Sequence, residues 1–457
     1  MSFSRREMLQ VAGGGFGYLA LQGLLAEQSA AANPLASKAS HFAARAKRVI
    51  FLFMRGGVSQ VDSFDYKPEL SKRDGEELSG GRKYFQSPWK FKQYGQSGLW
   101  VSDLFKHIAQ HADDLCVVNS MHTDVGNHPQ AILQMLTGSF QFVRPSVGAR
   151  VTYGLGTENQ NLPAFLCINP DFSAGGGQNF GSAFLPPACA GTAIGEGDSG
   201  DGKGARSLKG VSIPYTENSK FAVDEQRRQL DLLQTLNRER LAQDGANERL
   251  ESLNQSYELA FRMQSQMPEL MNVENESRHT LKRYGIDEEP TDNIGRACLM
   301  ARRYSEAGVR FVQISHGFWD HHVNLLERHP EMAEQCDQPI AALLSDLKER
   351  GLLDETLVVR TSEFGRPPLL NKTNGRDHNP AGFSIWMAGG GVKGGLRYGE
   401  TDPTGQTAMV DKVHLHDFHA TMLHQLGLDH KQLTYRYGGR DFRLTDVHGN
   451  VVHDLLS

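Results

Sequence analysis

Acidic and imidazole side chains occur together in two short segments, a pattern typical of metal sites. In residues 317–322 (GFWDHH), Asp320 and His322 are two positions apart and follow an apolar run. A carboxylate and an imidazole at this spacing can ligate one divalent ion. In residues 375–380 (GRDHNP), His378 lies among turn-forming residues that can fold back over such a site. The alternative for residues 317–322 is a solvated loop with an incidental pair of histidines.

Further acids and two arginines extend the candidate site. Glu363 stands where the end of a strand could bring its carboxylate to a metal, or it is a surface charge. Arg366 and Arg376 can each clamp an oxyanion through two N–H groups, or they pair with nearby acids. Asp62 or Asp65, after the first apolar run, could supply another carboxylate or begin a helix.

Two other segments are rich in histidine. Residues 122–129 (HTDVGNHP) place His128 directly before a predicted helix at 130–136, and a helix N-terminus is a natural anion site. Residues 414–419 (HLHDFH) begin another helix. We interpret these histidines as structural, on a strand or a helix cap, with Asp417 as a capping residue.

Four continuous apolar runs explain how these loops could meet. Such runs are typical of strands buried on both faces of a parallel sheet, and each leads into a polar loop. Helical patterns such as residues 338–349 lie between them, so we predict an α/β fold with a mainly parallel central sheet and helices on both faces. Ligands bind at the carboxyl edge of such sheets. The runs are 49–54, 115–118, 309–314 and 356–360. The residues expected at that edge are Asp62 or Asp65, His128, Asp320, His322, Glu363 and His378.

Two stretches interrupt this alternation. Residues 175–204 are rich in glycine and are predicted to form a long surface loop. Residues 218–284 are polar, charged and helical in period, so we expect helices packed beside the domain or over the site. We therefore predict a linker at 33–46 and one α/β domain at 47–457, with a helical insertion at about 218–284.

Residues 1–32 resemble an export signal of the twin-arginine type. Arg5 and Arg6 precede an apolar run at 11–25, and small residues follow at 29–33. We expect the twin-arginine machinery to export the folded chain to the periplasm or beyond. The rest of the chain has no segment long and apolar enough to predict a membrane span.

The composition and the cysteine spacing argue against several classes of function. With 48 basic and 53 acidic side chains the net charge is -5, which predicts no basic surface for nucleic acid or an anionic membrane. The five cysteines include no C-x-x-C pair, which excludes a zinc knuckle or thioredoxin-type motif. We expect mostly buried thiols, with a single disulfide as the alternative.

Further motifs are spread over nearly the whole chain after the leader. They are MRGG at 54–57 with Asp62, NHP at 127–129 with LTG at 136–138, RPS at 144–146, NLP at 161–163, WDHH at 319–322, EFGR at 363–366, GRDH at 375–378, AGGGVKGG at 388–395 and GGRDF at 438–442. As a set they resemble an exported bacterial sulfatase-like family, a domain of unknown function within the alkaline phosphatase superfamily.

The resemblance implies an alkaline phosphatase- or sulfatase-like fold that hydrolyses sulfate or phosphate esters, on a small-molecule or glycan substrate. By the same resemblance, Asp320, His322 and His378 hold a first divalent ion. Asp62 and Glu363 belong to a second. The ion is Zn, Ca, Mg or Mn.

The sequence departs from the superfamily at two places. Residues 363–364 are Glu-Phe where the superfamily has Asp-His, so one histidine ligand is missing. Residues 127–131 (NHPQA) stand where sulfatases have Cys/Ser-x-Pro-Ser-Arg, so the usual nucleophile and its arginine are missing. A metal-bound hydroxide or a histidine could replace that nucleophile. The candidate catalytic residues are Asn127, His128, Arg366 and Arg376.

Two functions follow as hypotheses. The first is an exported metal-dependent hydrolase of sulfate or phosphate esters that lacks the usual Ser, Thr or formylglycine nucleophile. The alternative is a non-catalytic exported binding or scaffold protein on a sulfatase-like fold.

Overall fold

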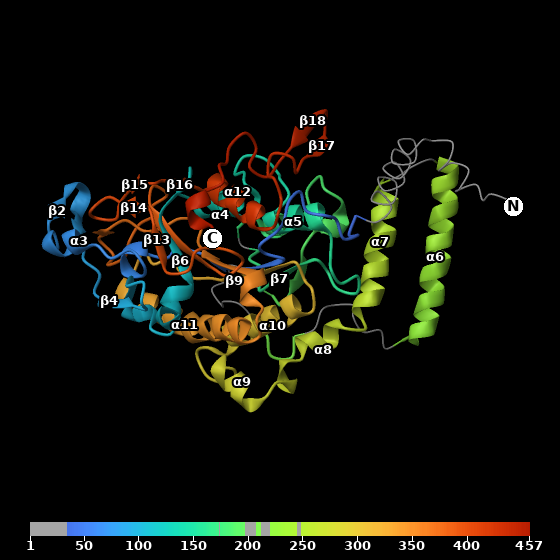
Figure 1. Cartoon of the computed structure of the whole chain (residues 1–457), viewed down its shortest axis with the longest axis horizontal. Helices are drawn as coiled ribbons and strands as arrows, with labels where there is room; N and C mark the ends of the chain where they lie inside the picture. The colour runs from blue at the N-terminus through green and yellow to red at the C-terminus, as the bar shows by residue number, and fades with distance from the viewer. Residues whose placement is uncertain (1–33, 173, 197–206, 212–219, 245–247) are drawn as a thin grey trace.

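The computed structural model describes residues 34–172, 174–196, 207–211, 220–244 and 248–457, so the predicted export signal lies outside the described residues. Within this part of the chain, a nine-stranded sheet forms the centre of the molecule (Figure 1). Its order is β13-β6-β12-β10-β1-β9-β7-β8, with β16 paired to β6. The strands are β1 (Arg48–Met54), β6 (Leu115–His122), β7 (Phe165–Ile168), β8 (Thr192–Ile194), β9 (Phe311–His316), β10 (Thr356–Thr361), β12 (Phe383–Ala388), β13 (Leu396–Tyr398) and β16 (Val413–His414).

The direction of the strands confirms the predicted mainly parallel sheet. Among the described strands of this sheet, only β12 runs antiparallel to its neighbours β10 and β6. The other pairings, such as β1 with β10 and with β9, are parallel. The four apolar runs seen in the sequence correspond to β1, β6, β9 and β10.

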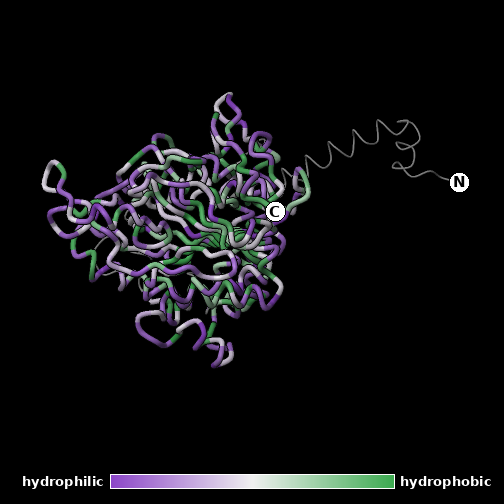
Figure 2. The backbone as a smooth tube through the Cα atoms, turned by 60° about the vertical axis from the view of Figure 1, so that its left-hand side comes forward, coloured by the Kyte–Doolittle hydropathy of each residue, from purple (hydrophilic) through white to green (hydrophobic). Residues whose placement is uncertain are grey.

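Helices cover both faces of the sheet, as predicted. On one face lie α10 (Asp292–Glu306) and α11 (Leu325–Glu349), and on the other lie α4 (His128–Thr137), α5 (Val147–Leu155) and α12 (Leu415–Gln425) (Figure 1). Alternate residues of β1 therefore enter different cores: Ile50 and Leu52 pack towards α10 and α11, whereas Phe51 and Phe53 pack towards the other helices. Figure 2 shows the hydrophobic residues gathered along these central strands.

The structure differs from the sequence predictions in two elements. The glycine-rich stretch 175–204 contains β8, which adds a short edge strand parallel to β7. The three residues of β8 stand between two glycines and are too few to show the alternation that predicts a strand. The helix predicted at 338–349 begins already at Leu325 and contains Pro330 and Pro339. Burial of one face of α11 holds the helix together across these breakers.

The stretch around 218–284 contains four helices beside the sheet. They are α6 (Val223–Asp244), α7 (Glu248–Met263), α8 (Met267–Met271) and α9 (Arg278–Arg283). Helices α6 and α7 lie side by side at one end of the molecule (Figure 1), and Arg227 pairs with Glu258 across them at 2.9 Å. Over the described residues, the helices are too short or too polar for one of them to cross a bilayer.

The structure also contains shorter helices and strands outside the central sheet. They are α3 (Pro68–Lys72), the sheet of β2 (Glu77–Leu78), β3 (Arg82–Tyr84) and β11 (Leu369–Leu370), and the hairpin-like pairs β4 (Phe91–Tyr94) with β5 (Leu99–Ser102), β14 (Glu400–Thr401) with β15 (Ala408–Val410), and β17 (Tyr435–Tyr437) with β18 (Arg440–Phe442). All five cysteines are buried free thiols, which confirms the expectation of buried thiols.

The histidines at 414–419 have the structural roles predicted for them. His414 is the N-cap of α12, and Asp417 completes a capping box by accepting a hydrogen bond from the backbone N–H of His414 at 3.1 Å. His419 is fully buried and donates from Nε2 to the carbonyl of Met135 at 2.8 Å. These contacts tie α12 to the neighbouring helix α4.

Acidification is expected to destabilise the protein through His419. Burial lowers the pKa of this imidazole from its ordinary 6.5 to about 3. The unfolded chain therefore gains a proton as the pH falls below 6.5, while the folded chain does not until about pH 3, so stability is lost across this window. By about pH 5 the loss is ~2 kcal/mol from this residue.

Denaturant unfolding at neutral pH and at about pH 5 measures this effect. His419→Gln keeps an N–H donor for Met135 but cannot take up the proton, so its stability should depend less on pH than that of the parent. An equal pH dependence in parent and variant would contradict the assignment.

Candidate metal centre

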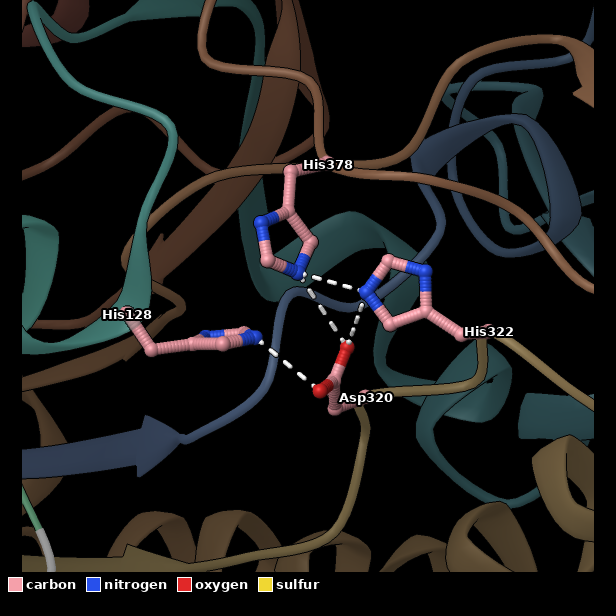
Figure 3. Close-up of side chains that lie close together, drawn as sticks. All are labelled: His128, Asp320, His322 and His378. Carbon is pink, nitrogen blue, oxygen red and sulfur yellow. Dashed lines mark hydrogen bonds and ion pairs between the residues drawn. The ribbon is translucent and has the colours of Figure 1, made fainter.

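Four side chains converge at the carboxyl edge of the sheet: His128, Asp320, His322 and His378 (Figure 3). His128 is the first residue of α4, Asp320 and His322 lie in the loop after β9, and His378 lies in the loop before β12. Each offers one ligand atom, and these atoms all lie within 4.8 Å of one another. The fold thus brings the first residue of a helix and two loops together into one cluster.

Asp320 lies at the centre of this cluster. Its Oδ1 is 3.1 Å from Nε2 of His322 and 3.3 Å from Nε2 of His378. Its Oδ2 is 3.2 Å from Nε2 of His128. The Nε2 atoms of His322 and His378 are 2.8 Å apart. Three imidazole nitrogens and one carboxylate therefore surround one point, which is a donor set that suits a divalent transition-type ion.

Glu363 orients His128 from behind. Nδ1 of His128 donates to Oε1 of Glu363 at 2.6 Å, so that Nε2 points into the cluster and is the atom that would bind an ion when it carries no proton. Glu363 is fully buried, and the backbone N–H of Gly56 donates to its two oxygens at 2.9 and 3.1 Å. A carboxylate behind a histidine in this way is typical of metal ligands.

The other two histidines are anchored through the same ring atom. Nδ1 of His378 donates to the carbonyl of Gly126 at 2.6 Å, and Nδ1 of His322 lies 3.3 Å from Oδ1 of Asp377. With a proton on each Nδ1, the Nε2 lone pairs of the two rings face each other and repel. A cation between them removes that repulsion, so the residues present fit a bound metal ion.

The electrostatics of the cluster favour a cation. Burial would lower the pKa of His128, but the carboxylates of Asp320 and Glu363 outweigh it and raise the pKa to about 9. Burial would likewise raise the pKa of Asp320, but His128, His378 and Arg366 hold that pKa far below its usual range. The two ionised carboxylates thus create a negative electrostatic field around one imidazole. A divalent ion bound there would neutralise this field.

Arg366 positions Asp320. Its guanidinium is buried and donates from Nη2 to Oδ1 of Asp320 at 2.6 Å. The remaining contacts go to main-chain carbonyls: Gly57 at 2.9 Å, Arg376 at 2.8 Å, and Gly56. With most of its N–H groups engaged, the oxyanion contact expected for Arg366 stays a prediction that this geometry does not favour.

Arg376 and Asp62 form an ion pair with no exposed surface on either side chain. The guanidinium donates to both carboxylate oxygens, at 2.8 and 3.1 Å, and to the carbonyls of Pro367 and Phe85. The structure therefore does not bring Asp62 into the cluster. Asp65 is also buried elsewhere, paired with a lysine at 3.1 Å. The second-ion role of Asp62 and the oxyanion role of Arg376 stay predictions.

Asn127 caps the helix that carries His128. Its side chain accepts a hydrogen bond from the backbone N–H of Gln130 at 3.2 Å, and α4 begins at the next residue. The local sequence thus explains the position of His128, because the cap ends the loop and sets the first helical turn. The catalytic role considered for Asn127 stays a prediction.

Two glycines allow the loops of the site to approach closely. A Cβ on Gly56 would lie 2.5 Å from the backbone nitrogen of Asp320, and one on Gly375 would lie 2.1 Å from the backbone of His322. Asp377, which lies behind His322, was not among the predicted site residues. The signal available was its position directly before His378 in the GRDH motif.

Several solved structures are similar to this chain at low sequence identity, with TM-scores of 0.40 or below. The lipoteichoic acid synthase LtaP from Listeria monocytogenes has 9% identity and a TM-score of 0.40, covering 92% of this chain and 80% of its own. The PsFucS1 sulfatase from Pseudoalteromonas sp. has 14% identity and a TM-score of 0.36, covering 94% and 72%. Alkaline phosphatase from the Antarctic bacterium TAB5 has 12% identity and a TM-score of 0.32, covering 78% and 95%.

No curated protein matches the chain significantly. A family match covers nearly all of the described domain, over residues 46–456. The chain therefore belongs to the family described as protein of unknown function DUF1501.

Proposed function

We propose that this chain is a metal-dependent hydrolase of sulfate or phosphate esters. The observation that carries the proposal is the convergence of Asp320, His322 and His378 with His128, each imidazole held by an oxygen behind it. The side chains of Asp320 and His322 are about two-fifths exposed, at 42% and 39%, so the cluster is open to a substrate from solvent. Three fixed donors and an open side are the arrangement of catalytic rather than structural sites.

In this proposal the ion is held by Asp320, His322 and His378, and Arg366 keeps the carboxylate in place. The bound ion supplies a Lewis acid for the ester oxygens. Nitrogen donors dominate the cluster, which favours zinc over manganese, calcium or magnesium, ions that suit oxygen ligands. His128, oriented by Glu363, is placed to move a proton at Nε2.

The attacking group in this proposal is water. The two side-chain hydroxyls considered from the sequence are engaged elsewhere: Ser59 donates to Asp62 at 2.5 Å and Thr123 to Gln134 at 2.8 Å. Neither is directed at the cluster. A water oriented by the His128–Glu363 pair would replace the side-chain nucleophile that sulfatases have at the position of residues 127–131.

Hydrolysis of para-nitrophenyl sulfate and para-nitrophenyl phosphate tests the proposal. The purified protein is first stripped with a chelator and then reloaded separately with zinc, manganese, calcium or magnesium. We expect turnover that disappears with the chelator and returns with zinc. The absence of turnover on both esters with all four ions would refute the hydrolase.

A non-catalytic binding protein is the second candidate, and the position of His128 favours it. If His128 is a fourth ligand, protein atoms complete a tetrahedral shell and leave no place for substrate. His128→Ala separates the two functions. In the hydrolase the variant retains its metal and loses about 10²- to 10⁴-fold in turnover. In the binding protein it loses the metal.

We propose further that the chain is exported by the twin-arginine machinery and acts in the periplasm or outside the cell, on a small-molecule or glycan ester. The support is the sequence at 1–32, with Arg5 and Arg6 before the apolar run. A fusion of these residues to a reporter should reach the periplasm. Replacing both arginines by lysine should keep the reporter in the cytoplasm, and unchanged export would exclude this route.

A further inference from the structure

A second cavity lies beside the metal centre at the same edge of the sheet. Its volume is about 270 Å³, and it is lined by residues that follow three neighbouring strands: Arg55 after β1, Asn169 after β7, and His316 at the end of β9. Helices α10 and α11 contribute the opposite wall. The metal centre uses the loops of β9 and β10, so the two sites are neighbours along this edge.

The wall of the cavity contains polar groups without partners. Asn169 is 2% exposed, yet neither its Oδ1 nor its Nδ2 has a hydrogen-bond partner among the described residues. Ser315 is 6% exposed, and its hydroxyl also has no partner within the part of the chain that the structure describes. A buried polar group costs free energy when it makes no hydrogen bond. Two such residues in one cavity indicate that a polar ligand supplies their missing hydrogen bonds.

The backbone next to these groups is strained. Asn169 has φ 52 and Phe318 has φ 72, both in the left-handed region. For an aromatic residue this conformation is costly, and such strain gathers at binding sites. It holds the Phe318 ring in the wall of the cavity, 5.6 Å below the guanidinium of Arg55. A flat apolar ring beside amide and hydroxyl groups suits a ligand with one polar and one apolar face.

The charges of the wall disfavour an anion. Among the described residues that line the cavity, two carboxylates, Asp171 and Glu289, oppose one guanidinium, that of Arg55, which lies 3.2 Å from Asp171. His316 is neutral, because burial lowers its pKa to about 4. A sulfate or phosphate group would meet a net negative wall here, whereas hydroxyl groups can donate to the carboxylates and accept from Asn169.

The cavity and the metal centre share one loop. Phe318 lines the cavity and Asp320 belongs to the cluster, so their Cα atoms lie at most about 7 Å apart. Gly56 approaches Asp320 while its neighbour Arg55 lines the cavity. A ligand that spans this loop would place an ester at the cluster and its next unit in the cavity.

We propose that this cavity binds a neutral sugar unit, so that the substrate is a glycan ester. The amide of Asn169 and the hydroxyl of Ser315 receive the sugar hydroxyls, and the ring of Phe318 packs on the apolar face of the sugar. The role of this unit in catalysis rests on the proposed hydrolase activity, but its binding does not.

Saturation-transfer NMR and calorimetry with the methyl glycosides of galactose, glucose, mannose and fucose test the binding. We expect at least one glycoside to bind the parent. Asn169→Gly removes the amide while tolerating the left-handed backbone, and Ser315→Ala removes the hydroxyl. Each variant should bind that glycoside about fivefold more weakly.

Ser305→Ala is the matched control, because Ser305 is also buried and unpartnered but lies in α10 outside the cavity wall. It should bind the glycoside like the parent. Ser315→Ala should also unfold at the same denaturant concentration as the control, because neither change removes a hydrogen bond. Failure of all four glycosides to bind, or equal binding by the parent, Asn169→Gly and Ser315→Ala, would overturn the proposal.

Asp320→Asn separates this proposal from the hydrolase. The variant should still bind the glycoside, because Asp320 does not line the cavity. If the parent binds the glycoside but hydrolyses no ester, the result would support sugar binding in the cavity and refute the hydrolase activity. Loss of glycoside binding in a folded Asp320→Asn protein would overturn the separate sugar site.

Discussion

Asp320→Asn is expected to lower metal affinity more than 100-fold and to remove ester hydrolysis with it. Changes to residues behind a metal ligand already cost 10- to 100-fold, and Asp320 is proposed as a ligand itself. Its two oxygens lie 3.1–3.3 Å from the Nε2 atoms of three histidines, so the amide would present an N–H or a weaker dipole where the ion needs a charge. Metal content after dialysis, and competition with a chromophoric chelator, measure the loss.

His448→Ala is a suitable control for this experiment, because His448 is an exposed histidine that is not part of the cluster. Its metal content should equal that of the parent. The fold of Asp320→Asn should persist, since Arg366 keeps its contacts to the carbonyls of Gly57 and Arg376. A folded Asp320→Asn protein that retains the full metal content would exclude this carboxylate as a ligand.

Breaking the ion pair between Arg376 and Asp62 is expected to destabilise the protein by about 3–5 kcal/mol. Both side chains are fully buried, and two hydrogen bonds at 2.8 and 3.1 Å join them. Asp62→Asn leaves the guanidinium charged and without its counter-ion in the interior. Denaturant unfolding followed by circular dichroism gives the free energy of unfolding of parent and variant.

The double variant Asp62→Leu/Arg376→Met tests whether the cost comes from the unpaired charge. It should be more stable than the two single changes predict by addition, because no buried charge is left without a partner. Additive losses would show that the pair contributes little. The same proteins test the second-ion role predicted for Asp62: a drop in metal content with unchanged stability in Asp62→Asn would support that role instead.

The architecture was largely predictable from local sequence. Each of the strands β1, β6, β9 and β10 is a continuous apolar run, because a parallel sheet covered by helices on both faces buries every residue of its central strands. The edge strand β8 was not predictable, since its three residues acquire their conformation from pairing with β7. The cap at Asn127 and the capping box at His414 and Asp417 are also local features.

The sequence predicted which histidines and which aspartate lie in the cluster better than it predicted the role of each residue. Asp320, His322 and His378 lie together, as the spacing of acids and histidines at strand ends indicated. His128 was predicted as a catalytic residue and not as a ligand, yet its Nε2 lies 3.2 Å from Asp320 within the same cluster. Whether it is a ligand or a proton carrier is what His128→Ala decides.

By itself, the sequence determined the α/β class and which loops meet at the carboxyl edge, because apolar runs and turn residues act over a few positions. Only the tertiary structure decided which acid pairs with which base. Asp62 and Arg376 are joined across 314 positions, and Glu363 and His128 across 235. A buried charge takes whichever partner the packed chain places within about 3 Å, and no local pattern specifies that partner.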